Sequence, residues 1–597
     1  MIFGPFSSWA VSLNKIHRYI WLVLGAATVL FHLGLIFSGL VPNLVSRPLH
    51  MALALPWALI LMARNPLEKV TGYVLTVFGV FAAGWIAWNH SDLSDQYGYL
   101  IDDFQLYLAF GLLITVLEMA RRAIGWPLPL VALIALAYGM FGQHIPGEFG
   151  YAGVPLESFL GTMTIAEGGL WGKLTGVSVG VVAIFVIFGA FLNAGEAGAG
   201  FMNVAAAAAG KLKGGTAKVS VISSALFGSI SGSASANVAS TGAITLPAMT
   251  KLGYPRALAA AVEAVASSGG QIMPPLMGAG AFVMVELTGV PYTGIMAAAI
   301  LPAFLYFFAV WMGINAFARR YELKGLAAED QPDTRSVIIT SLFFLVPFTV
   351  LLWAMFVLGY TPQYAACLAI MAAVVLLLID KNFKVDLRKI GGRFEQALMN
   401  SGKQVAMIAS IILCASIIIG TLGVTGLGVK ITSLILSGSG GMLWPALLLT
   451  ALACMVLGME VPTTAAYVIC VSVAGPALID IGLEPLQAHL FVFWFALLST
   501  ITPPVCGAVF IAAGMVNENW LKVALFAMAL GIGLYLIPLG MIANPTLITL
   551  VSSPVWSLLA TVKVGLALSA ISYGVIAPFS PLIRGGLIAG GGVLLFI

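Results

Sequence analysis

The segment QIMPPLMGAGAFV (271–283) is matched further along the chain by TITPPVCGAVFIA (500–512). Each contains a proline pair, with a glycine three residues after the second proline. Upstream, Pro247 and Pro476 are separated by the same offset as Pro274 and Pro503. A single offset that holds from Pro247 to Val283 without a gap indicates an internal duplication. We call two positions related by this offset equivalent positions.

The charges around the two copies predict how they are oriented. The first copy is flanked by basic residues, and the equivalent positions of the second carry none: Lys211, Lys213, Lys218, Lys251 and Arg256 become Gly440, Met442, Leu447, Asp480 and Pro485. By the positive-inside rule, the first copy opens to the cytoplasm and the second to the outside. Two related units of opposite orientation form an inverted repeat, which in secondary transporters holds the substrate and ion sites near mid-membrane.

The composition requires a lipid environment. Of the 597 residues, 60% are hydrophobic and 8% are charged, whereas soluble domains carry about 25% charged residues. We therefore predict an all-α polytopic membrane protein. The formal net charge of +4 comes from short loops between apolar runs, a pattern that fits membrane orientation better than nucleic-acid binding. The five cysteines lie in apolar stretches without motif spacing and are interpreted as core residues.

Apolar runs and loop charges predict the domain organisation. Five spanning runs precede a glycine-rich stretch at 143–174. Basic residues follow every second run, with Arg47 as the exception, which predicts a cytoplasmic N-terminus. The basic segment 381–403 could be a surface amphipathic helix or an ordinary loop. We predict N-terminal scaffold helices (1–165), a permease body (166–545) with repeats at about 200–320 and 425–543, and extra C-terminal membrane helices (546–597).

The Gly- and Ser-rich stretches beside the proline pairs are the candidate site. SISGSASANVASTG (229–242) is a poor spanning helix, and proline pairs remove backbone donors. Irregular backbone is tolerated at membrane depth only where protein buries it or water lines it. Its carbonyl and hydroxyl oxygens suit Na⁺, and half-helix N-termini suit a carboxylate. The alternative is that small residues merely let helices approach closely.

The candidates fall into two groups. The predicted ion-binding residues are Ser231, Gly232, Ser233, Ser235, Asn237, Gly458, Glu460, Pro462, Thr463, Thr464, Thr500 and Thr502. The predicted substrate-binding residues are Ser267, Ser268, Gly269, Gln271, Pro274, Pro275, Ser499, Pro503 and Pro504.

Acidic residues inside apolar runs are costly and are functional candidates by default. Glu118 precedes Arg121 and Arg122, so an ion pair is the better interpretation. Glu263 could face a cavity, and Glu460 lies in the second broken segment. Either of these two could carry a proton if transport is coupled to H⁺.

Four motifs resemble a known family: GSISGSASANVASTGAITLPAM, GYPRALAAAVEAVASSGGQIMPPLMGAGAF, GMEVPTTAAYV and STITPPVCGAVF. They are similar to the large membrane subunit of tripartite ATP-independent periplasmic (TRAP) transporters over roughly 170–545. The PPLMGAGAF form and the extra N-terminal helices resemble the TAXI subgroup, in which the small membrane subunit is fused to the large one.

The resemblance implies uptake of an organic anion, often a carboxylate, delivered by a periplasmic TAXI-type binding protein to the inner membrane. It implies an elevator movement of the transport domain against a scaffold, with Na⁺ as the coupling ion and no organic cofactor. The ion sites would lie at the hairpin tips 231–237 and 458–464. The first tip reads SGSASAN here rather than the SGSS start common in the family, so the identity of the ion stays open.

Other functions are less compatible with the sequence. A related elevator symporter could take its cargo directly from solution, but the extra N-terminal helices favour the binding-protein-dependent form. An enzyme or ATP-driven pump is disfavoured, since the sequence has no GxxxxGK[ST] loop and no HExxH pair. A channel would not need duplicated hairpins.

Overall fold

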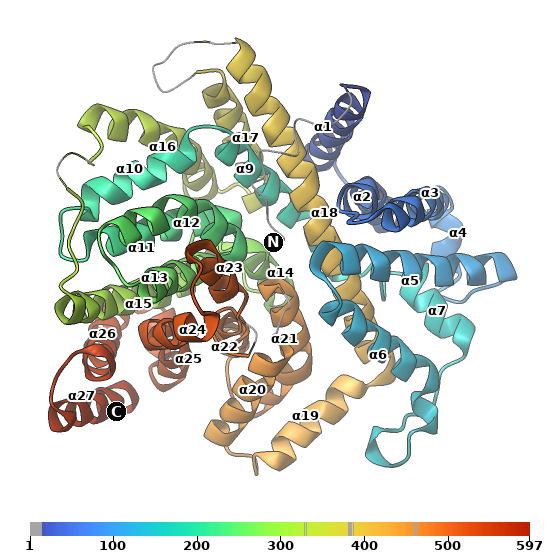
Figure 1. Cartoon of the computed structure of the whole chain (residues 1–597). Helices are drawn as coiled ribbons and strands as arrows, with labels where there is room; N and C mark the ends of the chain where they lie inside the picture. Colours follow the sequence, from blue (N-terminus) through green and yellow to red (C-terminus); the bar gives the residue numbers. More distant parts are fainter. Residues whose placement is uncertain are drawn as a thin grey trace. The chain divides into compact units, whose positions relative to one another are not determined.

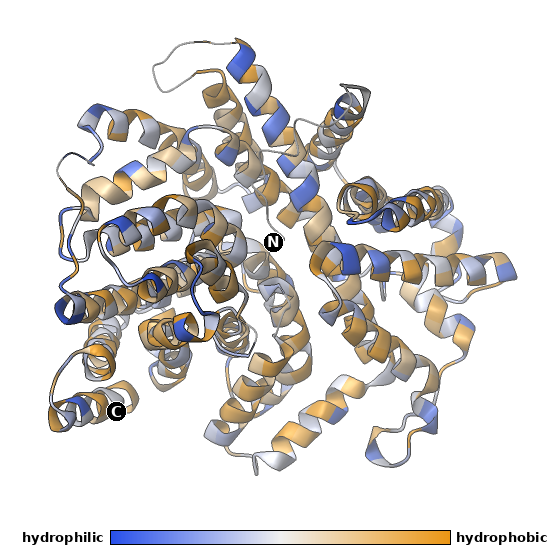
Figure 2. Cartoon of the chain, viewed as in Figure 1, coloured by the Kyte–Doolittle hydropathy of each residue, from blue (hydrophilic) through white to orange (hydrophobic). Residues whose placement is uncertain are grey.

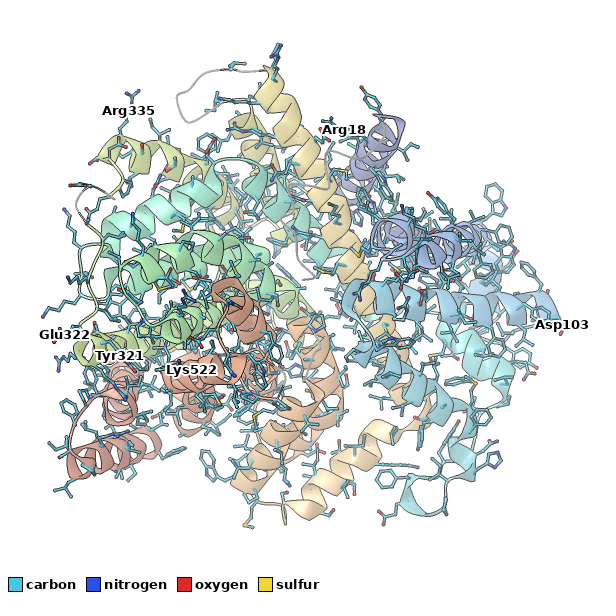
Figure 3. All side chains as sticks on the ribbon, viewed as in Figure 1. Arg18, Asp103, Tyr321, Glu322, Arg335 and Lys522 are labelled. Carbon is cyan, nitrogen blue, oxygen red and sulfur yellow. The ribbon has the colours of Figure 1, made fainter. Side chains whose placement is uncertain are left out.

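The computed structural model describes residues 15–327, 329, 331–379, 385, 387–458, 462–504 and 506–597. Within these residues the regular structure is helical, and twelve helices are long and apolar enough to cross a membrane. Apolar residues cover most of the ribbon (Figure 2). Several charged side chains lie at or near helix ends, as Figure 3 shows for Arg18, Asp103, Glu322 and Arg335. The prediction of an all-α polytopic membrane protein is confirmed.

The chain divides into two compact units that do not follow chain order (Figure 1). The first unit comprises the described parts of Met1–Gly125, Leu156–Ala197 and Phe343–Ser416. Its main helices are α1 (Lys15–Phe37), α2 (Asn43–Pro56), α3 (Pro66–Trp88), α4 (His90–Asp95), α5 (Asp103–Ile124), α7 (Leu156–Thr164), α8 (Lys173–Val177), α9 (Ala183–Ala194) and α17 (Pro362–Leu377), with parts of α16 (Thr334–Phe356) and α18 (Leu387–Thr425).

A buried arginine holds α5 against α2 and α3 in the first unit. Helix α2 continues into a π-helical turn, Trp57–Leu61, and such turns shift the intrahelical hydrogen-bond register. The Arg122 guanidinium donates to the carbonyl oxygens of Leu59 and Glu68. It also donates to Glu118 at 2.7 Å, and Arg121 pairs with Glu118 at 2.6 Å. The predicted ion pair of Glu118 with Arg121 and Arg122 is confirmed.

A second buried polar link joins α1, α2 and the π-helical turn Ser178–Val182. His32 Nε2 lies 2.7 Å from His50 Nδ1, and His50 Nε2 lies 3.0 Å from Ser178 Oγ. The other ring nitrogen of His32 lies 2.7 Å from the Thr28 carbonyl oxygen. Each ring nitrogen therefore has a partner, as buried polar groups require.

The basic segment near 381–403 is neither a loop nor a separate surface helix where it is described. From Leu387 it forms the first part of α18, a single 39-residue helix that continues into the following apolar run. Arg393 anchors this part by donating to the Ile379 carbonyl oxygen at 2.5 Å and to Glu196 at 2.6 Å. The absence of Pro, together with these partners, lets the helix continue without a break.

The second unit comprises Trp126–Pro155, Gly198–Leu342 and Ile417–Ile597. It contains α6 (Pro127–Phe141), α10 (Ala197–Ala209), α11 (Gly215–Ser231), α12 (Ala234–Lys251), α13 (Arg256–Gly269), α14 (Gly278–Thr288), α15 (Tyr292–Tyr321), α19 (Leu427–Gly438), α20 (Leu443–Leu457), α21 (Thr463–Asp480), α22 (Pro485–Leu498), α23 (Gly507–Val516), α24 (Trp520–Leu530), α25 (Ile532–Ala543), α26 (Pro554–Ile576) and α27 (Pro581–Phe596). Helices α26 and α27 pack on each other, and α26 packs on α15.

The helix boundaries reproduce the sequence duplication. Helices α12 and α21 begin and end at equivalent positions, and so do α13 and α22. Helix α23 begins at the position equivalent to the first residue of α14. We call α11–α15 repeat 1 and α20–α25 repeat 2. The two repeats therefore have the same order of elements, with α24 and α25 of repeat 2 in the place of the single helix α15 of repeat 1.

We expect Arg122→Met to destabilise the protein because it removes the donor to two buried carbonyls and leaves Glu118 with one fewer partner. Breaking a buried ion pair costs about 3–5 kcal/mol. Arg64 is exposed, and Arg64→Met should change the free energy of unfolding by about 0.5 kcal/mol at most. Thermal unfolding in detergent measures both variants. Equal midpoints for Arg122→Met and the unmodified protein would contradict the structural role of Arg122.

Candidate functional site

Helices α11 and α12 form a hairpin with a short turn between them. Gly232 adopts a left-handed conformation, with φ of +58°, and Ser233 is extended. The Ser233 hydroxyl accepts a hydrogen bond from the Ala236 amide at 3.3 Å and so caps α12. The hairpin is closed by this glycine and this cap.

The irregular backbone expected over 229–242 is confined to this turn, so that expectation was wrong in extent. Ser235 and Asn237 lie in the first turns of α12. Hydroxyl groups bond back to helix carbonyls, as Thr241 does to the Asn237 carbonyl oxygen at 2.8 Å. The backbone from Ala234 to Lys251 is one helix despite its Ser- and Thr-rich sequence.

The tip of the first hairpin lies on the break between α13 and α14. Helix α13 ends in a 3₁₀ turn, Gly270–Ile272, and α14 begins only at Gly278, beyond the cis-linked Pro274–Pro275 pair. A Cβ placed on Gly232 would lie 2.6 Å from the Gly278 Cα. The tip and the break therefore meet backbone to backbone, which only glycine permits.

In repeat 2, the described residues at the base of the hairpin tip lie beside the break after α22. Helix α20 ends before Gly458, and Pro462 precedes α21. A Cβ placed on Gly458 would lie 3.1 Å from the Ser499 hydroxyl oxygen, in the break between α22 and α23. The remaining tip candidate, Glu460, lies outside the described residues.

The two repeats pack on each other reciprocally. Helix α23 of repeat 2 packs on α12 and α13 of repeat 1, and α14 of repeat 1 packs on α21 and α22 of repeat 2. The Ser268 hydroxyl oxygen, in the last turn of α13, and the Thr500 hydroxyl oxygen, in the break after α22, lie 2.9 Å apart. A Cβ on Gly507 would lie 3.9 Å from the Ser235 hydroxyl oxygen. Site residues that are far apart in the sequence are thus gathered at one repeat interface.

Several hydroxyl groups at this interface can coordinate a cation through the oxygen or donate a hydrogen bond to an anion. The Ser231 hydroxyl is buried and has no hydrogen-bond partner among the described residues. Thr463 and Thr464, at the start of α21, are nearly buried. Thr502 lies 2.7 Å from the Tyr535 hydroxyl oxygen. The amino ends of α12 and α21 add partial positive charge beside these groups.

Two predicted site residues point instead into a separate buried cluster. Asn237 donates to the Ser224 carbonyl oxygen at 2.9 Å and to the Ser267 carbonyl oxygen at 3.4 Å. The Ser267 hydroxyl donates to Glu263 at 3.2 Å. Glu263, which could have faced a cavity, is fully buried.

Sequence reasoning missed the other members of this cluster, which contact Glu263 or one another: Ser220, Ser224, Thr241 and Thr245. A signal was available in the duplication, because the equivalent positions hold Leu449, Ala453, Cys470 and Ala474. Comparing the two copies residue by residue would have found a polar group in one that the other lacks.

Secondary-transporter membrane domains have this architecture: two repeats whose helical hairpins and interrupted helices meet at the interface between the repeats. The sequence comparisons agree. A family model described as "Tripartite ATP-independent periplasmic transporter, DctM component" matches residues 111–556. The chain therefore belongs to the DctM family of TRAP transporter permeases, and it is a transporter component rather than an enzyme.

Three relatives illustrate the similarity. The C4-dicarboxylate TRAP transporter large permease protein DctM of Pseudomonas aeruginosa is 24% identical over 328 residues, 54% of this chain and 74% of the relative. The isethionate TRAP transporter permease protein DctMQ of Oleidesulfovibrio alaskensis is 24% identical over 519 residues, 79% of this chain and 80% of the relative. The ectoine/5-hydroxyectoine permease UehC of Ruegeria pomeroyi is 22% identical over 414 residues, 66% of this chain and 90% of the relative.

We expect Gly232→Ala to disturb the first hairpin tip. The change forces a left-handed alanine, at a cost of about 1–2 kcal/mol, and places a methyl group against Gly278. Gly253→Ala is the matched control, because Gly253 also has a positive φ, of +83°, but nothing within 4 Å of an added Cβ. Thermal unfolding in detergent should show a larger loss of stability for Gly232→Ala. Equal losses of stability in the two variants would mean that Gly232 is no more closely packed than Gly253.

Proposed function

We propose that the protein is the membrane component of a secondary transporter that takes up a small organic anion across the inner membrane, driven by a cation gradient. The observation that carries this proposal is the reciprocal packing of two repeats, in which the first hairpin tip lies on its own helix break and Gly458 of the second repeat lies beside Ser499. In lipid, such a meeting of interrupted backbone is tolerated where it encloses a polar site.

The cargo proposed is a carboxylate held between the two breaks. The Ser268 and Thr500 hydroxyl groups come from opposite repeats, and the amino ends of α14 and α23 follow the two proline pairs. Hydroxyl donors and helix amino ends both favour an anion. The relatives' names give C4-dicarboxylates, isethionate and ectoine as cargo, so small organic acids are the class to test.

The coupling ion proposed at the tips is Na⁺. The unpartnered Ser231 hydroxyl supports this role, because a buried oxygen without a hydrogen-bond donor can coordinate a cation. Gly232, Ser233 and the hydroxyl groups of Thr463 and Thr464 add further oxygens at the two tips. H⁺ is the alternative coupling ion.

The transporter is proposed to depend on a periplasmic substrate-binding protein of the TAXI type. TRAP permeases work with a periplasmic substrate-binding protein. We propose that the N-terminal helices form the scaffold against which the repeats move as an elevator. The similarity to a DctMQ permease over 519 residues supports a fused small subunit. A symporter working without a binding protein is the alternative.

Reconstituted vesicles distinguish these two forms. Purified protein in liposomes is assayed with radiolabelled succinate, isethionate and ectoine under an imposed Na⁺ or pH gradient, with and without periplasmic extract of the source organism. We expect uptake only when the binding protein is present. Uptake without it would support the direct symporter, and no uptake of any organic acid under either gradient would contradict the proposal.

We expect Ser233→Ala and Thr464→Ala to weaken the dependence of uptake on Na⁺ more than they lower expression. Each removes one tip hydroxyl, and a lost ligand raises the Na⁺ concentration that gives half-maximal uptake. Ser437→Ala removes an exposed hydroxyl at the end of α19 and serves as the control. Unchanged Na⁺ activation in both tip variants would remove the tips from the ion site.

The opposite orientation of the repeats predicts opposite accessibility of the two tips. Cysteines introduced at Ser233 and Thr463 should react with a membrane-impermeant maleimide from opposite faces of the membrane. The five native cysteines are free and buried, so the unmodified chain gives the background. Labelling of both positions from the same face would contradict the inverted arrangement.

A further inference from the structure

The Glu263 carboxylate on α13 is surrounded by hydroxyl groups from three helices. Ser220 on α11 donates to it at 2.7 Å, and Thr241 and Thr245 donate from α12. Ser267, one turn along α13, donates at 3.2 Å, and the Ser224 hydroxyl on α11 is more distant, at 3.4 Å. We call Ser220, Thr241, Thr245 and Ser267 the hydroxyl cage. Glu263 itself has no exposed surface.

Repeat 2 builds the same helices without this cluster. The positions equivalent to Glu263 and the hydroxyl cage hold apolar or weakly polar residues: Val492, Leu449, Cys470, Ala474 and Ala496. Because α20–α22 form with these residues in place, the helical hairpin and the following helix do not need a buried carboxylate. A costly group that the architecture does not require indicates a function.

Among the described residues, no basic side chain contacts Glu263. On the helices packed against α13, the basic groups lie elsewhere: the Lys218 ammonium stands over the Trp311 ring, Lys522 pairs with Glu518, and Arg319 and Arg320 stand over tyrosine rings. Lys251 is the last residue of α12, and Arg256 is the first residue of α13. The Tyr306 hydroxyl donates to the Val265 carbonyl oxygen. The one charged residue on α14 and α23 is Glu286, which is exposed.

The hydroxyl cage can serve both protonation states of the carboxyl group. Four hydroxyl donors stabilise the carboxylate, which would otherwise be an unpaired buried charge at a cost of several kcal/mol. A hydroxyl can also rotate and accept, so a protonated Glu263 can donate its own proton to one of them. Backbone amides or an arginine would favour the charged state alone.

We propose that Glu263 is a proton-binding site of the transporter, which gains a proton on one side of the membrane and releases it on the other as the repeats move. This proposal rests on the transport function proposed above. The carboxylate oxygen takes the proton from water and returns it to water, so no other reactant is needed. The hairpin-tip oxygens proposed for Na⁺ are different residues.

The distances favour a proton over a metal cation at Glu263. The Ser220 hydroxyl oxygen lies 2.7 Å from a Glu263 carboxylate oxygen, and the Thr241 and Thr245 hydroxyl groups also contact the carboxylate. At this separation each hydroxyl donates directly to the carboxylate, since N–H or O–H donors lie about 2.5–3.2 Å from their acceptors. A cation placed between them would push these oxygens apart.

Gly242 lies between Glu263 and helix α23 of the second repeat. A Cβ placed on Gly242 would lie 3.1 Å from Glu263 Cγ and 3.4 Å from Met515 Cε on α23. Met515 is 42% exposed, and methionine side chains are flexible. Displacement of the Met515 side chain would admit water beside the glycine and so give Glu263 a path for proton exchange.

Infrared difference spectroscopy of the purified protein in lipid, between acidic and alkaline solution, tests the site without any cargo. We expect a band from a protonated carboxylic acid that Glu263→Gln abolishes and Glu286→Gln keeps. Thr245→Val, which removes one donor to the charged form, should make the band persist to higher pH. Identical spectra for the unmodified protein, Glu263→Gln and Thr245→Val would overturn the proposal.

Transport in the reconstituted system, with its binding protein and succinate as the probe, tests the coupling. A permanently neutral amide in place of the Glu263 carboxyl group would mimic the protonated carrier. Glu263→Gln should therefore keep the exchange of labelled for unlabelled succinate but lose accumulation driven by a pH gradient, whereas Glu286→Gln keeps both. Unaltered pH-driven accumulation in Glu263→Gln would overturn the proton site alone. Absence of uptake of every organic acid by the unmodified protein would count against the transport function instead, and the infrared result would then decide the proton site.

Discussion

In hydrocarbon, a backbone amide or carbonyl has no water to bond, and every interruption of a helix must be covered by protein. Among the described residues, the second unit interrupts its helices at Gly232–Ser233, at Gly270–Met277 and after Leu498. The first hairpin tip is covered by the break after α13, and Gly458 lies beside Ser499 at the break after α22. The helix after each break then packs on the opposite repeat. The site is therefore a consequence of satisfying backbone groups away from water, and the glycines at these contacts are required by how closely the backbones approach.

The duplication has kept the architecture while the two copies have diverged in polarity. Repeat 1 buries Glu263 among hydroxyl groups, whereas repeat 2 has apolar residues at most of those positions. Repeat 2 carries a different buried pair, in which the Tyr467 hydroxyl and His489 Nδ1 lie 2.7 Å apart. Repeat 1 has Val238 and Ala260 at the equivalent positions. Because the fold is the same in both copies, these differences separate what the helices need from what each repeat adds.

The fold class, the duplication and the ion pair at Glu118 could be predicted from the sequence, because they depend on composition, spacing and local charge. The extent of the hairpin turn could not. A Gly- and Ser-rich stretch favours irregular backbone on propensity alone, but the Ser233 cap starts α12 directly after Gly232, and packing against α11 and α13 stabilises the helix. The partners of Glu263 were also missed, because contacts between three helices do not follow from the order of residues in any one of them.

The position of Asn237 connects the hairpin tip to the buried carboxylate. Its amide group donates to carbonyl oxygens on α11 and α13, and its side-chain oxygen lies 3.3 Å from the Thr241 hydroxyl, which in turn contacts Glu263. Asn237 lies one turn beyond Ser233. A cation that drew Ser231 and Ser233 together would pull on the first turn of α12 and so on this network. The tip and the carboxylate are thus joined by a continuous set of hydrogen bonds, so occupancy at one can alter the donors available at the other.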